Sequence, residues 1–211
     1  MQKSGNSGEE EETESNSKYG FVYNKLVKDR VIFLSEDIEA ENASAIVAMM
    51  LLLNSQDKKK PITLFINSSG GYVEPSFAIY DTMNMIEAPV KTVCCGGASS
   101  FAAILLAAGT KGMRFATPSS RIMIHQIQLH GGSVATRGTD VEIEAKEVKA
   151  IKIKMTEVLA RHTGQTYRKV YRDCEVDKYM TVEEAKSYGI IDGILKPLKK
   201  IPKLKTGKTS A

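Results

Sequence analysis

The sequence predicts an α/β fold with a mostly parallel sheet, and three observations lead to this class. Short segments with the character of β-strands alternate with longer segments of helical periodicity. Of the 211 residues, 42% are hydrophobic, which is enough for one sizeable core. No apolar stretch is long enough to cross a bilayer, so the chain is predicted to form one domain of a protein that is not embedded in a membrane.

Five strands are predicted from short runs of apolar and β-branched residues. They are Val31–Leu34, Ile62–Asn67, Val90–Cys95, Arg114–Ala116 and Ile122–His125. Helical periodicity lies between and after these runs, in Ile38–Asn54, Pro75–Ile86, Ser100–Ala108 and Asp140–Arg161. This alternation is the reason for predicting parallel strands.

The last third of the chain is predicted to be largely helical. Asp140–Arg161 carries apolar residues on more than one face, whereas a surface helix needs only one apolar stripe. A short helix is predicted over Tyr167–Arg172. Thr181 and Glu184 form a capping box that begins one more helix, and Gly189 ends it.

Charge is distributed unevenly between the two ends. Residues 1–17 are acidic without an apolar anchor and are predicted to be a disordered leader, while residues 196–211 are rich in lysine and are predicted to be a flexible tail. The net charge of +4 therefore reflects the tail and gives no reason to expect a nucleic-acid partner. The leader lacks the features of a secretory signal or transit peptide, which favours the cytoplasm.

Two neighbouring serines stand where a strand-like run meets a helix-like run. Ser99 and Ser100 follow Gly96-Gly97-Ala98 and precede an apolar segment. At such a junction, free backbone N–H groups and the helix dipole stabilise developing negative charge, so either serine is a candidate nucleophile. The simpler interpretation is that small residues let a buried helix approach the sheet.

Two other segments supply the groups that a serine nucleophile needs. His125 ends a short apolar strand and is a candidate general base. Gly70 and Gly71 follow another strand, where paired glycines let backbone N–H groups turn toward a substrate oxygen. No metal site is predicted, since the three histidines lie far apart and the cysteines lack ligand spacing.

The other histidines and the paired cysteines are assigned to structure. His130 lies in a predicted loop, and His162 ends the long helix, where a cation would complement the helix dipole. Cys94 and Cys95 are neighbours on an apolar strand and are predicted to pack in the core.

Six short segments form a recognisable series along the chain. They are Ile66-Asn67-Ser68-Ser69-Gly70-Gly71, Tyr80-Asp81-Thr82-Met83, Gly96-Gly97-Ala98-Ser99-Ser100, Met123-Ile124-His125-Gln126, His162-Thr163-Gly164-Gln165 and Tyr188-Gly189-Ile190-Ile191-Asp192. In this order they resemble the ClpP serine proteases, collinearly from about Tyr19 to Leu195. The resemblance implies one protease domain over residues 18–195, with the ClpP and crotonase type of spiral, built from repeated β-β-α units, and a projecting long helix.

The resemblance also implies a catalytic site. It assigns the nucleophile to Ser100, the base to His125 and the orienting carboxylate to Asp177. Ser99 and Asp173 are the local alternatives, and Asp173 is interpreted as a surface or capping carboxylate at the end of a short helix. The resemblance places the oxyanion donors at the backbone N–H groups of Gly71 and Phe101, and a peptide-binding strand edge just after Gly71.

The implied function is that of the proteolytic subunit of a Clp protease. Such a serine endopeptidase hydrolyses unfolded polypeptides inside two stacked seven-membered rings of identical or related subunits. An AAA+ unfoldase such as ClpX, ClpA or ClpC would feed it and would dock at positions matching Phe65, Met85 and Val93, which ordinary core packing would also explain. The chain has no phosphate-binding loop of its own, so no cofactor is expected and ATP belongs to the partner. The resemblance makes the leader a candidate for a cleavable propeptide, and the alternative is a leader that is not processed.

Three departures from the ClpP pattern carry further predictions. Ser69 replaces a usual proline, which is expected to loosen the glycine turn. Phe101-Ala102 replaces Met-Gly, and the larger Phe101 is expected to narrow the first specificity pocket. The altered loop Gln126–Gly138 leaves ring composition open.

Two other functions fit part of the pattern. A crotonase-like acyl-CoA enzyme shares the fold but has no use for a nucleophile triad. A non-catalytic ring subunit would share the fold and assembly without activity.

Overall fold

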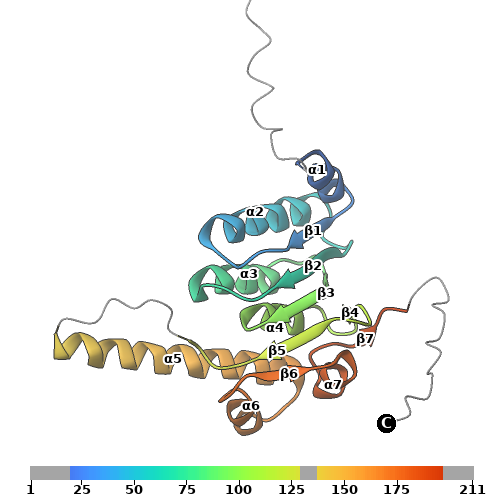
Figure 1. The fold of residues 1–211 in the computed structure, drawn as a ribbon. Helices are drawn as coiled ribbons and strands as arrows, with labels where there is room; N and C mark the ends of the chain where they lie inside the picture. Colours follow the sequence, from blue (N-terminus) through green and yellow to red (C-terminus); the bar gives the residue numbers. More distant parts are fainter. Residues whose placement is uncertain (1–19, 129–136, 197–211) are drawn as a thin grey trace, which may run out of the picture.

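A computed structural model describes residues 20–128 and 137–196, and Figure 1 shows their arrangement. The predicted acidic leader, His130 and all but the first residue of the predicted basic tail lie outside these residues. The elements are α1 (Gly20–Lys28), β1 (Val31–Leu34), α2 (Ala40–Gln56), β2 (Ile62–Ser68), α3 (Val73–Met85), β3 (Val90–Ser99), α4 (Phe101–Ala107), β4 (Arg114–Ala116), β5 (Arg121–Ile124), α5 (Gly138–Thr163), α6 (Tyr167–Asp173), β6 (Lys178–Met180), α7 (Val182–Tyr188) and β7 (Gly193–Ile194).

The strands form one mostly parallel sheet. Its main path runs in the order β1-β2-β3-β4-β7, and every pair on this path is parallel. β5 pairs in parallel with the second half of β3, and β6 pairs antiparallel with β5. The predicted α/β fold with a mostly parallel sheet is confirmed, while α1, β6 and β7 were not predicted.

Strand β3 is longer than predicted because it bends and continues past the expected end. Ile66 pairs with Cys94 but Ser68 pairs with Ala98, so the register with β2 shifts between these pairs. Gly96 has a φ of +107°, and a Cβ there would overlap the Asn67 side chain. The bend lets the first half of β3 pair with β4 and the second half with β5, which carries the strand to Ser99.

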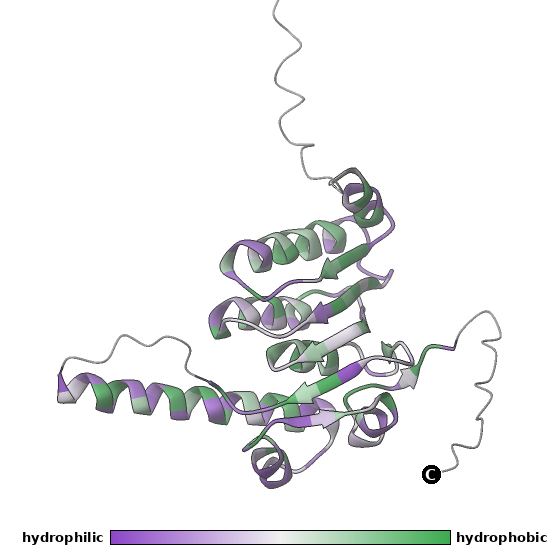
Figure 2. Cartoon of the chain, viewed as in Figure 1, coloured by the Kyte–Doolittle hydropathy of each residue, from purple (hydrophilic) through white to green (hydrophobic). Residues whose placement is uncertain are grey.

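The core lies between this sheet and helices α2, α3 and α4, which follow the strands in succession in Figure 1. Every residue of α4 is buried, as its uninterrupted apolar sequence requires. In Figure 2, apolar colouring dominates α4 and β1, whereas α5 alternates between polar and apolar residues along its length. The apolar composition of α4 therefore accounts for its position in the core of the protein.

Helix α5 projects away from the rest of the chain (Figure 1). Its buried residues Met155, Thr156, Val158 and Leu159 lie in the second half. In the first half, Val141 is 54% exposed and Ile143 is 65% exposed. Packing within a single chain therefore buries only some of the apolar residues of this helix, and those in its first half stay exposed.

The ends of two helices match the predicted signals. Thr181 and Glu184 form the capping box that begins α7, and Gly189 ends it in the left-handed region at φ 95°. Helix α2 begins at Ala40, later than predicted, because Glu39 and Asn42 cap it. Ile38 pairs instead with Gly71 as an isolated parallel bridge.

The prediction that both neighbouring cysteines pack in the core is wrong for Cys95. Cys94 is buried as expected, but Cys95 is exposed, since successive strand residues face opposite sides of a sheet and β3 bends beyond Cys94. His162 lies in the last turn of α5, as predicted, but its surroundings disfavour the cationic form. Burial, followed by the charges of Arg114 and Arg161, lowers the pKa of His162, and its Nε2 lies 3.0 Å from the Tyr80 hydroxyl.

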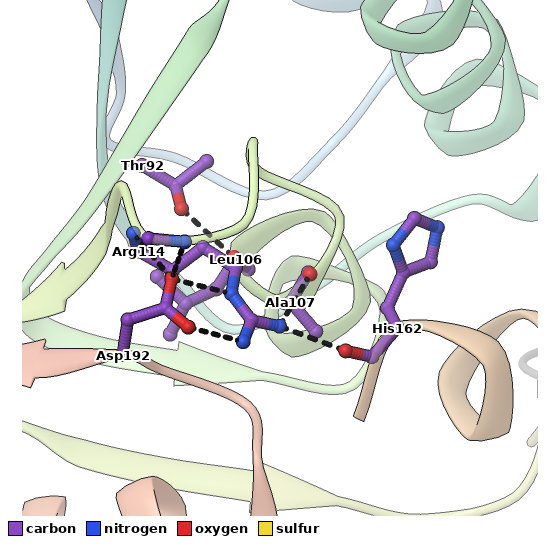
Figure 3. Close-up of polar contacts among 7 residues, drawn as sticks. Thr92, Leu106, Ala107, Arg114, His162 and Asp192 are labelled. Carbon is purple, nitrogen blue, oxygen red and sulfur yellow. Dashed lines mark hydrogen bonds and ion pairs between the residues drawn. The ribbon is translucent and has the colours of Figure 1, made fainter. Parts of the chain in front are cut away.

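The amino-terminal edge of the sheet is held by a buried ion pair (Figure 3). The Arg114 side chain is 5% exposed and places Nη2 2.6 Å from Oδ1 of Asp192. Its Nε donates to Oδ2 of Asp192 at 2.8 Å, and Nη1 donates to the carbonyls of Ala107 and His162. One guanidinium thus joins β4, the ends of α4 and α5, and the turn before β7.

Candidate active site

Sheet register brings three predicted residues to one corner. Ser99 pairs with Met123, and the backbone N–H of Ser100 donates to the carbonyl of Met123 at 2.9 Å. Ile124 pairs with Lys178 in the antiparallel β5-β6 ladder. One residue beyond each ladder, Ser100, His125 and Asp177 therefore lie at the same sheet edge.

The histidine and the aspartate face each other directly. Nδ1 of His125 lies 3.4 Å from Oδ1 of Asp177. The His125 side chain is only 10% exposed, whereas that of Asp177 is 47% exposed. This distance is within ion-pair range but longer than a charge-assisted hydrogen bond.

Ser100 has an unusual backbone. Its φ of 55° and ψ of −127° are rare for a residue with a side chain, and it is the N-cap of α4. Such a conformation costs about 1–3 kcal/mol and is concentrated at functional sites. A serine on a strained strand-to-helix turn exposes its hydroxyl at the top of the sheet, as in the nucleophile elbow of other hydrolases.

Ser100 and His125 share one pocket. Its other lining residues are Ile104, Ile124, Gln126, Ile127, Lys152, Met155, Thr156, Leu159 and Cys174. Most are apolar, so the surroundings of Ser100 and His125 on this side are largely hydrocarbon. Burial raises the pKa of Cys174 to about 11, so this thiol stays protonated and is no rival nucleophile.

The glycine turn lies directly against the serine. A Cβ on Gly70 would come within 2.6 Å of the Ser100 Cβ, so only glycine fits there without a shift. The N–H of Ile38 donates to the carbonyl of Gly70 and the N–H of Tyr72 donates to the carbonyl of Ile38. The N–H of Gly71 belongs to the same trans peptide group as the Gly70 carbonyl, so it points in the opposite direction, away from Ile38.

A second N–H group is available next to Ser100. Phe101 is the first residue of α4, and the first N–H groups of a helix have no acceptor within it. The N–H groups of Gly71 and Phe101 therefore come from elements on either side of Ser100, which is an arrangement able to receive an oxyanion.

The side chain of Phe101 does not do what the sequence predicted. It is 1% exposed, and its ring packs edge-on against Phe77 with 4.8 Å between centroids. It points into the core and is absent from the lining of the pocket. The prediction that it narrows the first specificity pocket is wrong, because the first helical residue here turns its side chain toward α3.

Ser69 has a contact that the sequence did not predict. Its hydroxyl donates a hydrogen bond to the carboxylate of Asp37, in the connection between β1 and α2. A side-chain contact thus restrains the turn at the position where proline was expected to be needed.

The local alternatives have other partners. Ser99 is part of β3 and pairs with Met123. Asp173 accepts from Lys169 at 2.5 Å and lies 3.4 Å from Lys178. Burial acts to raise the pKa of Asp173, but Lys169 and further neighbours lower it below its ordinary value. Asp173 is therefore neither a capping nor a surface residue, since its side chain is 12% exposed and bridges two lysines.

The three residues assigned to unfoldase docking differ in exposure. Phe65 is partly buried and stacks on Phe33 with 5.2 Å between centroids. Met85, the last residue of α3, is 71% exposed, and Val93 is 1% exposed. A partner could reach Phe65 and Met85, whereas Val93 supports the sheet beneath.

The described residues contain neither a cluster of metal ligands nor a membrane-spanning helix. Within residues 20–128 and 137–196, no three histidine, cysteine or acidic side chains gather as metal ligands would. Nor does any helix in these ranges combine the length and apolar character needed to cross a membrane.

An α/β sheet with serine, histidine and aspartate at one carboxyl-terminal edge has the parts of a serine hydrolase. The family model for Clp protease matches residues 13–197. The chain therefore belongs to the Clp protease family and is a peptidase of that family, which confirms the resemblance found in the sequence.

Proposed function

We propose that this protein is a serine endopeptidase and the proteolytic subunit of a Clp protease. The observation that carries the proposal is the register of β3, β5 and β6, which brings Ser100, His125 and Asp177 to one corner. These residues come from positions spread over 77 residues of sequence, and the corner coincides with the strained backbone of Ser100.

In the proposed acylation step, Oγ of Ser100 attacks the carbonyl carbon of the scissile peptide bond. His125 takes the hydroxyl proton as the new C–O bond forms, and Asp177 orients the imidazole and stabilises its cation. The carbonyl oxygen becomes an oxyanion that accepts hydrogen bonds from the N–H groups of Gly71 and Phe101. His125 then protonates the leaving amine, the C–N bond breaks and an acyl-enzyme remains.

Water completes the proposed reaction. His125 takes a proton from the water as its oxygen attacks the acyl carbon, and returns that proton to Oγ of Ser100 as the ester bond breaks. The carboxylate product leaves and the serine is regenerated. These steps need only the side chains, the two N–H groups and water, so no cofactor is required by this subunit.

The proposed substrate is unfolded polypeptide, which reaches the site inside an assembly of these or related subunits. The exposed apolar residues in the projecting half of α5 support an assembly, since a single chain leaves Val141 and Ile143 in water. We propose that this half of α5 joins two stacked rings of seven. An AAA+ unfoldase such as ClpX, ClpA or ClpC would use ATP and contact Phe65 and Met85.

The catalytic proposal is tested with a fluorophosphonate probe, which phosphonylates an activated serine. We expect one adduct per chain, mapped to Ser100, and loss of labelling and peptide cleavage in Ser100→Ala. Ser99→Ala is the matched control and should keep both. Labelling that persists in Ser100→Ala but disappears in Ser99→Ala would overturn the assignment.

The assembly proposal is tested separately by light scattering. The double variant Val141→Asp, Ile143→Asp should lower the assembled mass and the rate of protein degradation, because it places charge on the apolar tip of α5. Glu142→Gln with Glu144→Gln alters the same turn of the helix without touching an apolar side chain and should leave the mass unchanged. Equal masses for the parent and the first variant would contradict the proposal.

A further inference from the structure

We propose that the hydrogen bond between Ser69 and Asp37 is a positioning contact for the oxyanion donor at Gly71. The inference rests on the proposed function, because it assigns a task to the oxyanion turn of that site. Ser69 and Asp37 do not touch the substrate in this proposal, and they act through the backbone of Gly71.

The contact extends a short backbone ladder. The N–H of Ile38 donates to the carbonyl of Gly70 at 2.7 Å, and the N–H of Tyr72 donates to the carbonyl of Ile38 at 2.9 Å. The residues just before this ladder on each strand are Asp37 and Ser69, whose side chains are hydrogen-bonded to each other. The turn is therefore fixed on both sides of Gly70.

Asp37 is held in place by the start of α2. The side-chain amide of Asn42 donates to the carbonyl of Asp37 at 2.7 Å, while its Oδ1 accepts from the N–H of Glu39 at 2.9 Å. α2 has 17 residues and buries Ala43 and Ile46 against the core. A hydrogen bond to Asp37 thus ties the glycine turn to a packed helix.

The other polar contact in the turn cannot do this. The hydroxyl of Ser68 contacts the N–H of Gly70 at 3.2 Å and its carbonyl at 3.3 Å. Both partners belong to the same short turn, so these bonds shape it without fixing its position against α2. The Ser69 side chain, by contrast, joins the turn to Asp37.

A small displacement of this turn should matter for catalysis. The turn packs closely between Ser100 and Ile38. A Cβ on Gly70 would come too close to Ser100, and a Cβ on Gly71 would overlap the backbone of Ile38. An oxyanion donor must lie about 2.7–3.1 Å from the developing charge. Loss of the Ser69 contact would let the N–H of Gly71 move relative to Ser100, which weakens transition-state binding more than substrate binding.

The test is steady-state cleavage of a short peptide, with active sites counted by probe titration. Ser69→Ala and Asp37→Ala should each lower kcat about tenfold with KM nearly unchanged, less than the roughly 10²–10³-fold loss for deleting an oxyanion donor. The double variant should be no slower than the slower single variant, because both remove the same contact. A peptide boronate, whose tetrahedral adduct places an oxygen in the oxyanion site, should lose affinity by the same factor.

Conservative variants separate positioning from general damage. Ser69→Thr keeps the hydroxyl and Asp37→Asn keeps an acceptor oxygen, so both should retain most of kcat even if the alanine variants fold poorly. Ser55→Ala removes a surface hydroxyl that donates to Leu52 in α2 and should match the parent in kcat.

Each failure has a distinct result. Cleavage that survives Ser100→Ala would overturn the proposed function itself. Ser100-dependent cleavage with parental kcat and boronate affinity in Ser69→Ala would overturn only the positioning inference. Additive losses in the double variant, or losses in KM alone, would also overturn it.

Discussion

The two edges of the sheet use polar side chains in opposite ways. At the amino-terminal edge, the Arg114 side chain is 5% exposed, and its guanidinium has carboxylate or carbonyl acceptors on Nε and both Nη atoms. At the carboxyl-terminal edge, Ser100 has a strained backbone and His125 meets an aspartate that is 47% exposed. The polar groups at the amino-terminal edge thus bind one another within the chain. Those at the carboxyl-terminal edge face the candidate active site.

The direction of the helices explains this difference. The carbonyls of Ala107 and His162 lie at or near the C-terminal ends of α4 and α5, where partial negative charge favours a cation such as Arg114. The N-terminal end of α4 instead presents free N–H groups beside Ser100. The buried ion pair and the strained serine therefore lie at opposite edges, so variants at the two edges should separate stability from catalysis.

The largest expected effect comes from Asp177→Asn. An amide cannot stabilise the imidazolium of His125, and in a well-studied triad protease this change lowers kcat on the order of 10⁴-fold. We expect a similar loss in probe labelling rate and peptide cleavage, with an unchanged midpoint of unfolding. Stopped-flow labelling and urea unfolding measure the two quantities.

Asp173→Asn is the matched control for Asp177→Asn. It weakens the contacts with Lys169 and Lys178, so it should lower stability and leave the labelling rate of the folded protein near that of the parent. A loss of labelling in Asp173→Asn alone would reverse the assignment of the two carboxylates.

Arg114→Met removes the ion pair at the amino-terminal edge of the sheet. The change leaves the Asp192 carboxylate partly buried without its cation and two carbonyls without a donor, which should cost about 3–5 kcal/mol of unfolding free energy. Because the site lies at the opposite edge, kcat per titrated site should stay at the parental value. Lys111→Met removes an exposed cation nearby and should cost little. A large fall in kcat in Arg114→Met at full folding would show that the two edges are coupled.

The sequence predicted one edge far better than the other. The Ser99-Ser100 pair stands where a strand-like run meets a helix-like run, and His125 ends an apolar run, so the pattern marked the pair and the histidine, while the choice of Ser100 came from the family resemblance. Asp177 required the family resemblance, because β6 has three residues and its pairing with β5 leaves no periodic signal. Arg114 and Asp192 are 78 residues apart, and neither lies in a pattern that predicts burial.

The errors at single residues have physical causes of the same kind. Whether Phe101 faces the pocket or the core depends on the angle at which α4 leaves the sheet, which follows from the unusual φ of Ser100. Whether Ser69 loosens its turn depends on Asp37, 32 residues earlier. Strand and helix positions follow from local periodicity, whereas these contacts depend on tertiary packing.

A smaller effect on kcat is expected from Gln126→Met, which tests how Asp177 is held at the carboxyl-terminal edge. The side-chain amide of Gln126 donates to the carbonyl of Glu175 at 3.0 Å, two residues before Asp177. Its backbone N–H also donates to the carbonyl of Cys174 at 2.7 Å, and this bond survives the change. Loss of one hydrogen bond, worth about 1 kcal/mol, should lower kcat roughly fivefold by loosening Asp177.

The measurement for Gln126→Met is the pH profile of kcat together with KM. A looser Asp177 should shift the acid limb of the profile, because that limb reports the ionisation of the base, while KM should change little. Gln128→Met is the matched control, as Gln128 is exposed and lies just two residues further along. Equal profiles for Gln126→Met and the parent would show that the backbone bond alone holds the loop.

The smallest expected effect is a dependence of stability on pH that originates at the amino-terminal edge. Burial first, and then the charges of Arg114 and Arg161, lower the pKa of His162 below 6.5 in the folded protein. The unfolded chain therefore binds more protons than the folded one between the lowered pKa and 6.5, so stability is fully present above pH 6.5 and is lost on acidification through that window. Urea midpoints measured between pH 7.5 and 5 should fall less in His162→Gln than in the parent. Tyr80→Phe removes the hydroxyl near Nε2 but leaves the burial, so it should keep the parental pH dependence; an equally steep fall in His162→Gln would assign that dependence to other groups.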